Sequence, residues 1–84
     1  MNEIIQYIKF WLIKNRPELK SNDRDALALG IYQVKKSEIE NLEEGARVIY
    51  IQEFLNLNYL KSAYNLIKDV FQEYFSKEWK KRSK

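Results

Sequence analysis

The sequence predicts an all-α fold, a small antiparallel bundle of four helices, from three observations. Apolar residues make up 45% of the 84 residues and recur at intervals of three and four in four segments, which is the period of an amphipathic helix. One proline and two glycines leave few interruptions. The segments are joined by short connections, which favour antiparallel neighbours. A three-helix core with a docked fourth element, and a dimer that completes its core across a twofold axis, are the alternatives.

The first helix is predicted to run from about Glu3 to Asn15. Pro17 ends it, because the residue before a proline avoids the α conformation. Phe10 and Ile13 fall on the polar side of the helix, which makes them candidate exposed apolar residues. The apolar stripe consists of Ile4, Ile5, Tyr7, Ile8, Trp11 and Leu12.

The second helix is predicted to open at Ser21 or Asn22, with Asn22 as the N-cap residue. Asp23 and Asp25 in the first turn favour the positive end of the helix dipole. Gly30 lies beside the apolar face, where the missing side chain would let another helix approach closely. That face consists of Leu27, Ile31 and Val34.

The third helix is predicted to begin at Ser37, because Ser37-Glu38-Ile39-Glu40 has the spacing of a capping box. After Gly45 the apolar residues cover most of the helix circumference. This half is therefore predicted to be central in the bundle and contacted from two sides. The apolar residues are Val48, Tyr50, Ile51, Phe54 and Leu55.

The fourth helix is predicted to follow a turn at Asn56-Leu57-Asn58, with Asn58 as its N-cap residue. The apolar stripe ends near Phe75, because Glu78 would otherwise project into the core. Residues 1–76 are therefore predicted to form the bundle and residues 77–84 a basic extension. The stripe consists of Leu60, Ala63, Ile67, Val70, Phe71 and Tyr74.

The composition removes several classes of chemistry. The chain has no histidine and no cysteine, which excludes a thiol nucleophile, a Ser-His pair and a Cys/His zinc site. A cluster of glutamates is predicted to be a solvated helix start, because nothing indicates the cleft that paired catalytic carboxylates need. We therefore expect no enzyme activity, no cofactor and no metal. The glutamates are Glu38, Glu40, Glu43 and Glu44.

The net charge of +3 is concentrated at the C-terminal end. Residues 77–84 carry five basic side chains against the single acid Glu78, and they surround Trp79. An aromatic ring among cations suits an anionic membrane surface, or a nucleic acid whose base stacks on the ring. A solubilising helix end is the competing interpretation. The candidate membrane or nucleic-acid contacts are Lys77, Trp79, Lys80, Lys81, Arg82 and Lys84.

The excess of aromatic and apolar residues in the third and fourth helices predicts a contact with a partner protein. We expect a cytoplasmic, non-enzymatic binding protein, with peripheral membrane contact as a further property. A small phage- or plasmid-type regulator that binds nucleic acid through the tail, and a homodimeric adaptor bundle, are the alternatives. The candidate partner-binding residues are Phe54, Leu55, Tyr59, Tyr64, Phe75 and Trp79.

Three segments give the chain a family resemblance. They are Asn2-Glu3-Ile4, the run Asn22-Asp23-Arg24-Asp25-Ala26-Leu27, and Phe54-Leu55-Asn56-Leu57-Asn58-Tyr59-Leu60 between two long helices. In this layout the chain resembles the small immunity proteins of pediocin-like bacteriocins. The resemblance implies a cytosolic antiparallel bundle that protects a producer cell from its own bacteriocin at the membrane receptor. It also implies that the fourth helix and the Trp79 cluster form the recognition end.

Overall fold

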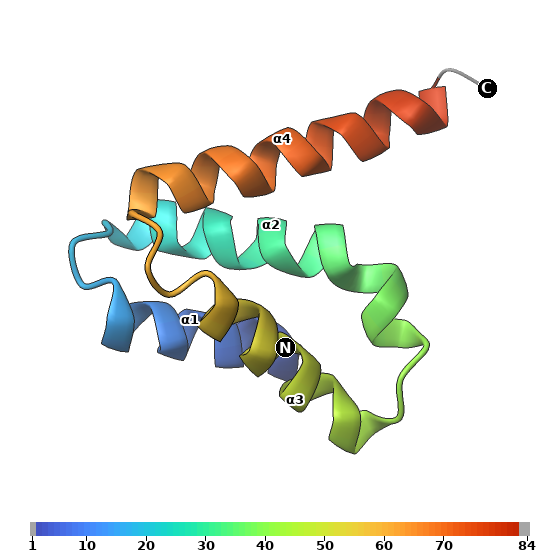
Figure 1. The fold of residues 1–84 in the computed structure, drawn as a ribbon, viewed down its shortest axis with the longest axis horizontal. Coiled ribbons are helices and arrows are strands. Elements are labelled where there is room, and N and C mark those ends of the chain that lie inside the picture. Colours follow the sequence, from blue (N-terminus) through green and yellow to red (C-terminus); the bar gives the residue numbers. More distant parts are fainter. Residues whose placement is uncertain (1, 83–84) are drawn as a thin grey trace.

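The computed structural model describes the backbone of residues 2–82 and the side chains of residues 2–80. It contains four helices, α1 (Glu3–Asn15), α2 (Ser21–Glu40), α3 (Glu44–Leu57) and α4 (Ala63–Arg82), and the described residues form no strand. The predicted all-α class and the four helices are confirmed (Figure 1). None of the helices, over the part of the chain that the structure describes, has the length and apolar character needed to cross a bilayer.

The central element is α2, which packs against α1, α3 and α4. α1 also packs against α3, whereas the described backbone of α4 comes close to α2 alone. α2 and α4 run in the same direction, and α1 runs antiparallel to α2 (Figure 1). The third helix is contacted from two sides, by α1 and α2, as predicted, but the prediction that it is central in the bundle is wrong. α2 takes that place because it is long and buries residues toward several neighbours, whereas α3 leaves Ile49 and Leu57 exposed.

α1 has the predicted limits. Its N-cap residue is Asn2, whose Oδ1 accepts hydrogen bonds from the amides of Ile4 at 2.8 Å and Ile5 at 3.3 Å. A side-chain cap of this kind satisfies amides that have no partner within the helix. Phe10 and Ile13, the two candidate exposed apolar residues on the polar side, are exposed. The stripe contributes Ile4, Ile8 and Leu12 to the core.

The capping-box prediction at Ser37 is wrong. α2 continues to Glu40, and α3 begins only at Glu44. The Ser37 hydroxyl donates to the Glu38 carboxylate at 3.0 Å rather than capping a new helix. The last turn of α2 keeps its helical form because it carries Ile39 into the core, where this side chain is buried. Burial of one large aliphatic side chain thus outweighs a local capping signal.

The N-cap predictions for two further helices also need correction. α2 begins at Ser21, one of the two predicted positions, but Lys20 and not Asn22 precedes it as the cap residue. Asn58 ends α3, where its Nδ2 donates to the carbonyl of Phe54 at 2.8 Å. α4 begins after Ser62, whose Oγ accepts a hydrogen bond from the amide of Asn65 at 3.1 Å.

The late start of α4 moves Leu60 out of the predicted buried stripe. Leu60 lies in the α3–α4 connection and is almost fully exposed. Leu66, which the predicted stripe omits, is buried instead, together with Val70. Ile67 and Tyr74 pack beside them as partly buried residues, so the remainder of the stripe agrees with the prediction.

Gly30 is the point at which α4 lies against α2. A Cβ atom placed on Gly30 would be 3.2 Å from Cγ1 of Val70 and 3.3 Å from Cε1 of Phe71. The predicted close approach of another helix at this glycine is therefore confirmed, and the helix is α4.

Gly30→Leu is expected to lower the free energy of unfolding by about 1–3 kcal/mol, because the new side chain overlaps Val70 and Phe71. Urea unfolding followed by circular dichroism measures the change. Gly45→Leu is the matched control, because nothing lies within 4 Å of a Cβ atom at that position in α3. Equal losses of stability at the two glycines would contradict close packing of α4 on α2.

Candidate protein-binding surface

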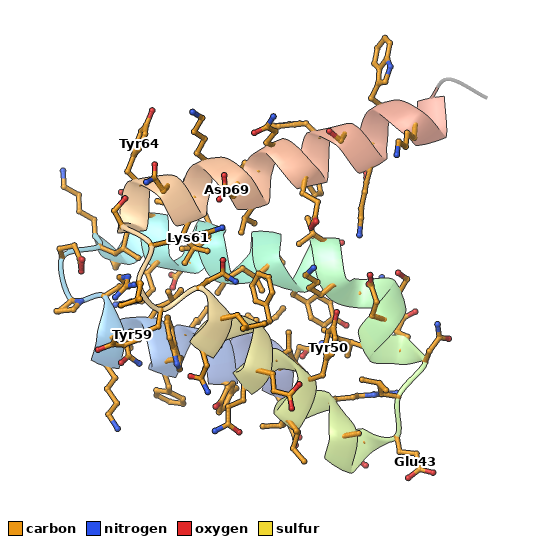
Figure 2. All side chains as sticks on the ribbon, viewed as in Figure 1. Glu43, Tyr50, Tyr59, Lys61, Tyr64 and Asp69 are labelled. Carbon is orange, nitrogen blue, oxygen red and sulfur yellow. The ribbon has the colours of Figure 1, made fainter. Side chains whose placement is uncertain are left out.

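The outer side of α4 carries three exposed aromatic side chains. Tyr64 is 73% exposed, Phe75 65% and Trp79 72%. Their separations of eleven and four residues place them on one side of a helix with 3.6 residues per turn. Tyr64 points away from the bundle (Figure 2). We call Tyr64, Phe75 and Trp79 the α4 face.

Two apolar hollows border the C-terminal half of the α4 face. One, of about 360 Å³, lies between α2 and α4 and is lined by Leu29, Gly30, Phe71 and Tyr74 together with Ala26 and Gln33. The other, of about 450 Å³, is lined by Tyr74, Phe75, Glu78 and Trp79. The Tyr74 ring meets the Phe75 ring edge to face, with the ring centroids 5.5 Å apart. Tyr74 therefore forms the ridge between two depressions that could each accept an apolar side chain.

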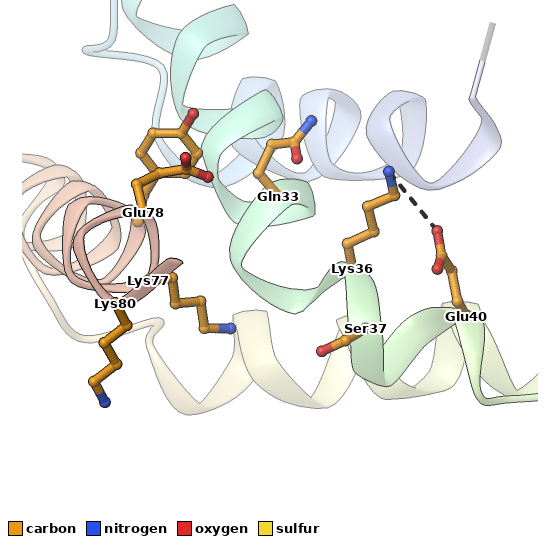
Figure 3. A pocket seen from close by; sticks show the side chains of 8 residues that line it. Gln33, Lys36, Ser37, Glu40, Lys77, Glu78 and Lys80 are labelled. Carbon is orange, nitrogen blue, oxygen red and sulfur yellow. Dashed lines mark ion pairs between the residues drawn. The ribbon is translucent and has the colours of Figure 1, made fainter. Parts of the chain in front are cut away.

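A third hollow, of about 440 Å³, lies on the polar side of the same ridge between the C-terminal halves of α2 and α4 (Figure 3). Lys36 forms an ion pair with Glu40 across its wall, at 3.9 Å, and Lys80 points away from α2 (Figure 3). Three lysines against two glutamates give this hollow a slight excess of positive charge. Its lining consists of Gln33, Lys36, Ser37, Glu40, Tyr74, Lys77, Glu78 and Lys80.

Lys77 is turned toward the bundle. Its Nζ donates a hydrogen bond to the main-chain carbonyl of Val34 in α2, and the side chain is partly buried. A hydrogen bond to its own main chain is the largest cause that lowers the pKa of Glu38, and the charge of Lys77 lowers it further. Of the predicted membrane or nucleic-acid contacts whose side chains the structure describes, Lys77 is therefore the one whose amine is directed toward α2.

A second lysine ties α2 to both later helices. Lys35 forms an ion pair with Glu73 of α4 at 3.8 Å, and its Nζ lies 4.9 Å from the ring centroid of Phe54 in α3. Burial raises the pKa of the Tyr50 hydroxyl nearby, and the carboxylates of Glu38 and Glu73 raise it further. These groups link α2, α3 and α4 where the described backbones of α3 and α4 stay apart.

The six predicted partner-binding residues do not lie on one surface: some are buried in the bundle and others are exposed. Leu55 is fully buried in the core and Phe54 is partly buried under Lys35, so neither offers the predicted surface. Both lie on the side of α3 that covers α1 and α2, which the sequence does not reveal because apolar residues cover most of the circumference of this helix. Tyr59 is half exposed and lies against Trp11, with the ring centroids 6.3 Å apart. The remaining three form the α4 face.

The C-terminal cluster is described in part. α4 continues past the predicted boundary after Ser76 to Arg82, so residues 77–82 prolong the helix. Lys80 is exposed beside Trp79. The predictions for the side chains of Lys81 and Arg82, and for Lys84, lie outside the described residues.

The predicted glutamate cluster is divided between the end of α2 and the start of α3, and its four side chains are exposed. Within the described part of the chain, no group of three or more Asp, Glu, His or Cys side chains is placed to hold a metal ion.

Sequence reasoning missed two features of the surface. One is Arg16, whose guanidinium lies 5.9 Å from the ring centroid of Trp11 and 5.4 Å from that of Tyr59. The other is the pair Leu57 and Leu60, which are the most exposed of the large apolar side chains described. Ser62, a good N-cap residue just before the last apolar stripe, is the signal that could have placed Leu60 in the connection.

Comparison of the chain with protein-family models, with curated proteins and with solved structures found no match.

Proposed function

We propose that the chain is a non-enzymatic, cytoplasmic binding protein that contacts a partner protein through the α4 face. The observation that carries this proposal is the exposure of Tyr64, Phe75 and Trp79 on one side of α4, whose other side packs on α2. Tyrosine, tryptophan and phenylalanine are enriched in protein interfaces and supply much of their binding energy. Exposed apolar residues that have no binding role are usually scattered singly over a protein surface, so three aromatic residues on one helix face indicate an interaction site.

The hollows on the two apolar sides of Tyr74 indicate how such a partner would bind. A partner helix that presents apolar side chains three or four residues apart could place one in each hollow. Lys36 and Lys80 at the polar hollow favour acidic side chains on the flank of that helix. The partner is therefore expected to be an amphipathic helix with an acidic border.

Recovery of partners from the source cells tests the proposal. The double variant Phe75→Ser/Trp79→Ser is expected to lose the partner that the unaltered chain retains, because both rings leave the interface. Phe10→Ser is the matched control, since Phe10 is equally exposed but lies on α1. Both substitutions are at exposed positions, so the helical content is expected to stay unchanged. A partner retained by the double variant would contradict the proposal.

The resemblance to bacteriocin immunity proteins makes the proposal more specific. Under this form of it, expression of the chain in a bacterium sensitive to a pediocin-like bacteriocin raises survival, and Phe75→Ser/Trp79→Ser removes the protection. A panel of such bacteriocins applied to cells with and without the chain measures this. If no bacteriocin in the panel is resisted, the immunity form of the proposal is contradicted and the proposal of partner binding stands without it.

A gel-shift experiment addresses the nucleic-acid alternative. Binding of DNA at roughly micromolar concentration and about 150 mM salt would favour a regulator, provided that Lys80→Ala weakens it. We expect no such binding, because the Lys77 amine binds α2 and the four other basic residues of the segment are a small set for a nucleic-acid binder.

A further inference from the structure

The connection between α3 and α4 exposes two leucines to solvent. Leu57, the last residue of α3, is 85% exposed, and Leu60 is 93% exposed. Tyr59 and Tyr64 lie on either side of Leu60 in sequence and are exposed in part. Exposure of two large aliphatic side chains three residues apart is unfavourable in water. We call Leu57 and Leu60 the leucine tip.

The leucine tip is held in place by the main chain beneath it. The Arg16 guanidinium donates hydrogen bonds to the carbonyl of Tyr59 and, at 2.7 Å, to the carbonyl of Lys61. These two residues flank Leu60, so one side chain fixes the connection on both sides of it. The amide of Lys61 also donates to the carbonyl of Asn58 at 3.1 Å. The exposed leucine therefore belongs to a fastened turn and not to a loose segment.

The helix connections at the two ends of the bundle differ in charge. The α1–α2 and α3–α4 connections lie at one end and the α2–α3 connection, with Glu43, at the other (Figures 1 and 2). The second end holds the four glutamates of residues 38–44 and also the C-terminal part of α4, which carries Lys77 and Lys80. Residues 14–20 and 57–69 at the first end hold two acidic side chains, Glu18 and Asp69, against five basic ones. The basic residues are Lys14, Arg16, Lys20, Lys61 and Lys68.

Two of these basic side chains are already engaged. Arg16 holds the turn, and Lys61 forms an ion pair with Asp69 at 2.7 Å (Figure 2). Lys14, Lys20 and Lys68 are exposed at the same end of the bundle as the leucine tip. The end that exposes the leucines thus carries an excess of basic side chains, which an anionic surface attracts.

We propose that the leucine tip docks on an anionic lipid bilayer. Leu57 and Leu60 enter the boundary between headgroups and acyl chains, and the half-exposed ring of Tyr59 lies at headgroup depth. Lys14, Lys20 and Lys68 lie against the lipid phosphates. A fluid bilayer accepts side chains that protrude from a turn, and charge attraction adds to the few buried methylene groups. This site is separate from the α4 face and does not depend on the function proposed for that face.

A fluorescent label at a single cysteine tests the position of the leucine tip. The chain has no cysteine, so Leu60→Cys and Ile49→Cys each provide one thiol for an environment-sensitive dye. We expect a blue shift and brighter emission at position 60 when vesicles of phosphatidylcholine with about 30% phosphatidylglycerol are added. No change is expected at position 49, which is exposed on α3. A change at position 49 but not at 60 would overturn the proposal.

Vesicle sedimentation measures the contribution of the leucines. Leu57→Ser/Leu60→Ser is expected to lower the partition onto the same vesicles by about tenfold or more, with helical content unchanged because both residues are exposed. Trp79→Ser is the matched control and is expected to change partition by less than about twofold, since the tip lies at the other end of α4.

Three further results would overturn the proposal. Loss of vesicle binding in Trp79→Ser but not in the leucine variant would assign the membrane contact to the C-terminal cluster. Equal binding to pure phosphatidylcholine vesicles would remove the role of the lysines. A dye response at position 60 that depends on protein concentration without vesicles would show that a second copy covers the leucines. Loss of the α4-face partner, with vesicle binding intact, would leave the leucine tip unaffected.

Discussion

Ile31→Ala is expected to lower the free energy of unfolding by about 2–5 kcal/mol. Ile31 is fully buried in α2, the helix that contacts all three others. Its truncation removes packing atoms from the middle of the bundle and leaves a cavity that the surrounding helices fill only in part. Small domains are stabilised by about 5–15 kcal/mol in total, so this one change removes a large share of the stability.

Urea unfolding measured by circular dichroism gives the size of the loss. Ile49→Ala is the matched control, because the same side chain at position 49 is 57% exposed. We expect that substitution to change the free energy of unfolding by less than about 0.5 kcal/mol. Similar losses at positions 31 and 49 would show that α2 is not the centre of the packing.

Arg16→Ala is expected to lower the free energy of unfolding by about 2–3 kcal/mol. The guanidinium donates to two carbonyls of the α3–α4 connection and lies over the rings of Trp11 and Tyr59. Hydrogen bonds from a charged donor contribute about 1.5–3 kcal/mol, and solvent at this exposed site reduces that value. The two ring contacts add about 0.5–1 kcal/mol each where solvent reaches them.

Arg16→Lys is expected to restore less than half of this stability. A lysine carries the same charge but lacks the planar fork that reaches both carbonyls. Lys14→Ala, which removes an exposed cation from the same end of α1, is expected to be nearly neutral. Hydrogen exchange provides a second readout, because Arg16→Ala should speed exchange at the amides of residues 58–62 more than in the rest of the chain. Uniform acceleration would mean that Arg16 does not fasten the connection.

Sequence signals that act over a few residues predict helix limits best where no burial of a nearby side chain opposes them. The limits of α1 follow from a regular apolar stripe and from Pro17, and both act within one turn of the chain. The close approach at Gly30 follows equally from one residue without a side chain. The same reasoning fails at Ser37 and Asn58, which were both predicted to begin a helix. Ser37 lies inside α2, and Asn58 ends α3. Burial of Ile39 keeps the last turn of α2 helical, and the Ser62 hydroxyl caps the start of α4.

The candidate surface was harder to predict than the helices. In α3 the apolar residues surround most of the helix, so their pattern cannot tell Leu55, which is buried, from Leu57, which is exposed. In α4 a clear polar side made it possible to predict that Trp79 lies off the core stripe, and it is exposed. Lys77 appears in the sequence as part of a basic tail, but its amine binds the main chain of α2.

The sequence by itself determined the all-α class, the number of helices and the limits of α1, and it made Phe10 and Ile13 candidates for exposure. These depend on the period of apolar residues and on backbone restrictions that act over a few residues. The tertiary structure alone decided that α2 is central, that α4 packs on α2, and that Leu57 and Leu60 protrude. Burial depends on which distant segments meet, as when Arg16 meets Tyr59 and Lys61 across more than forty residues, and no local pattern carries that information.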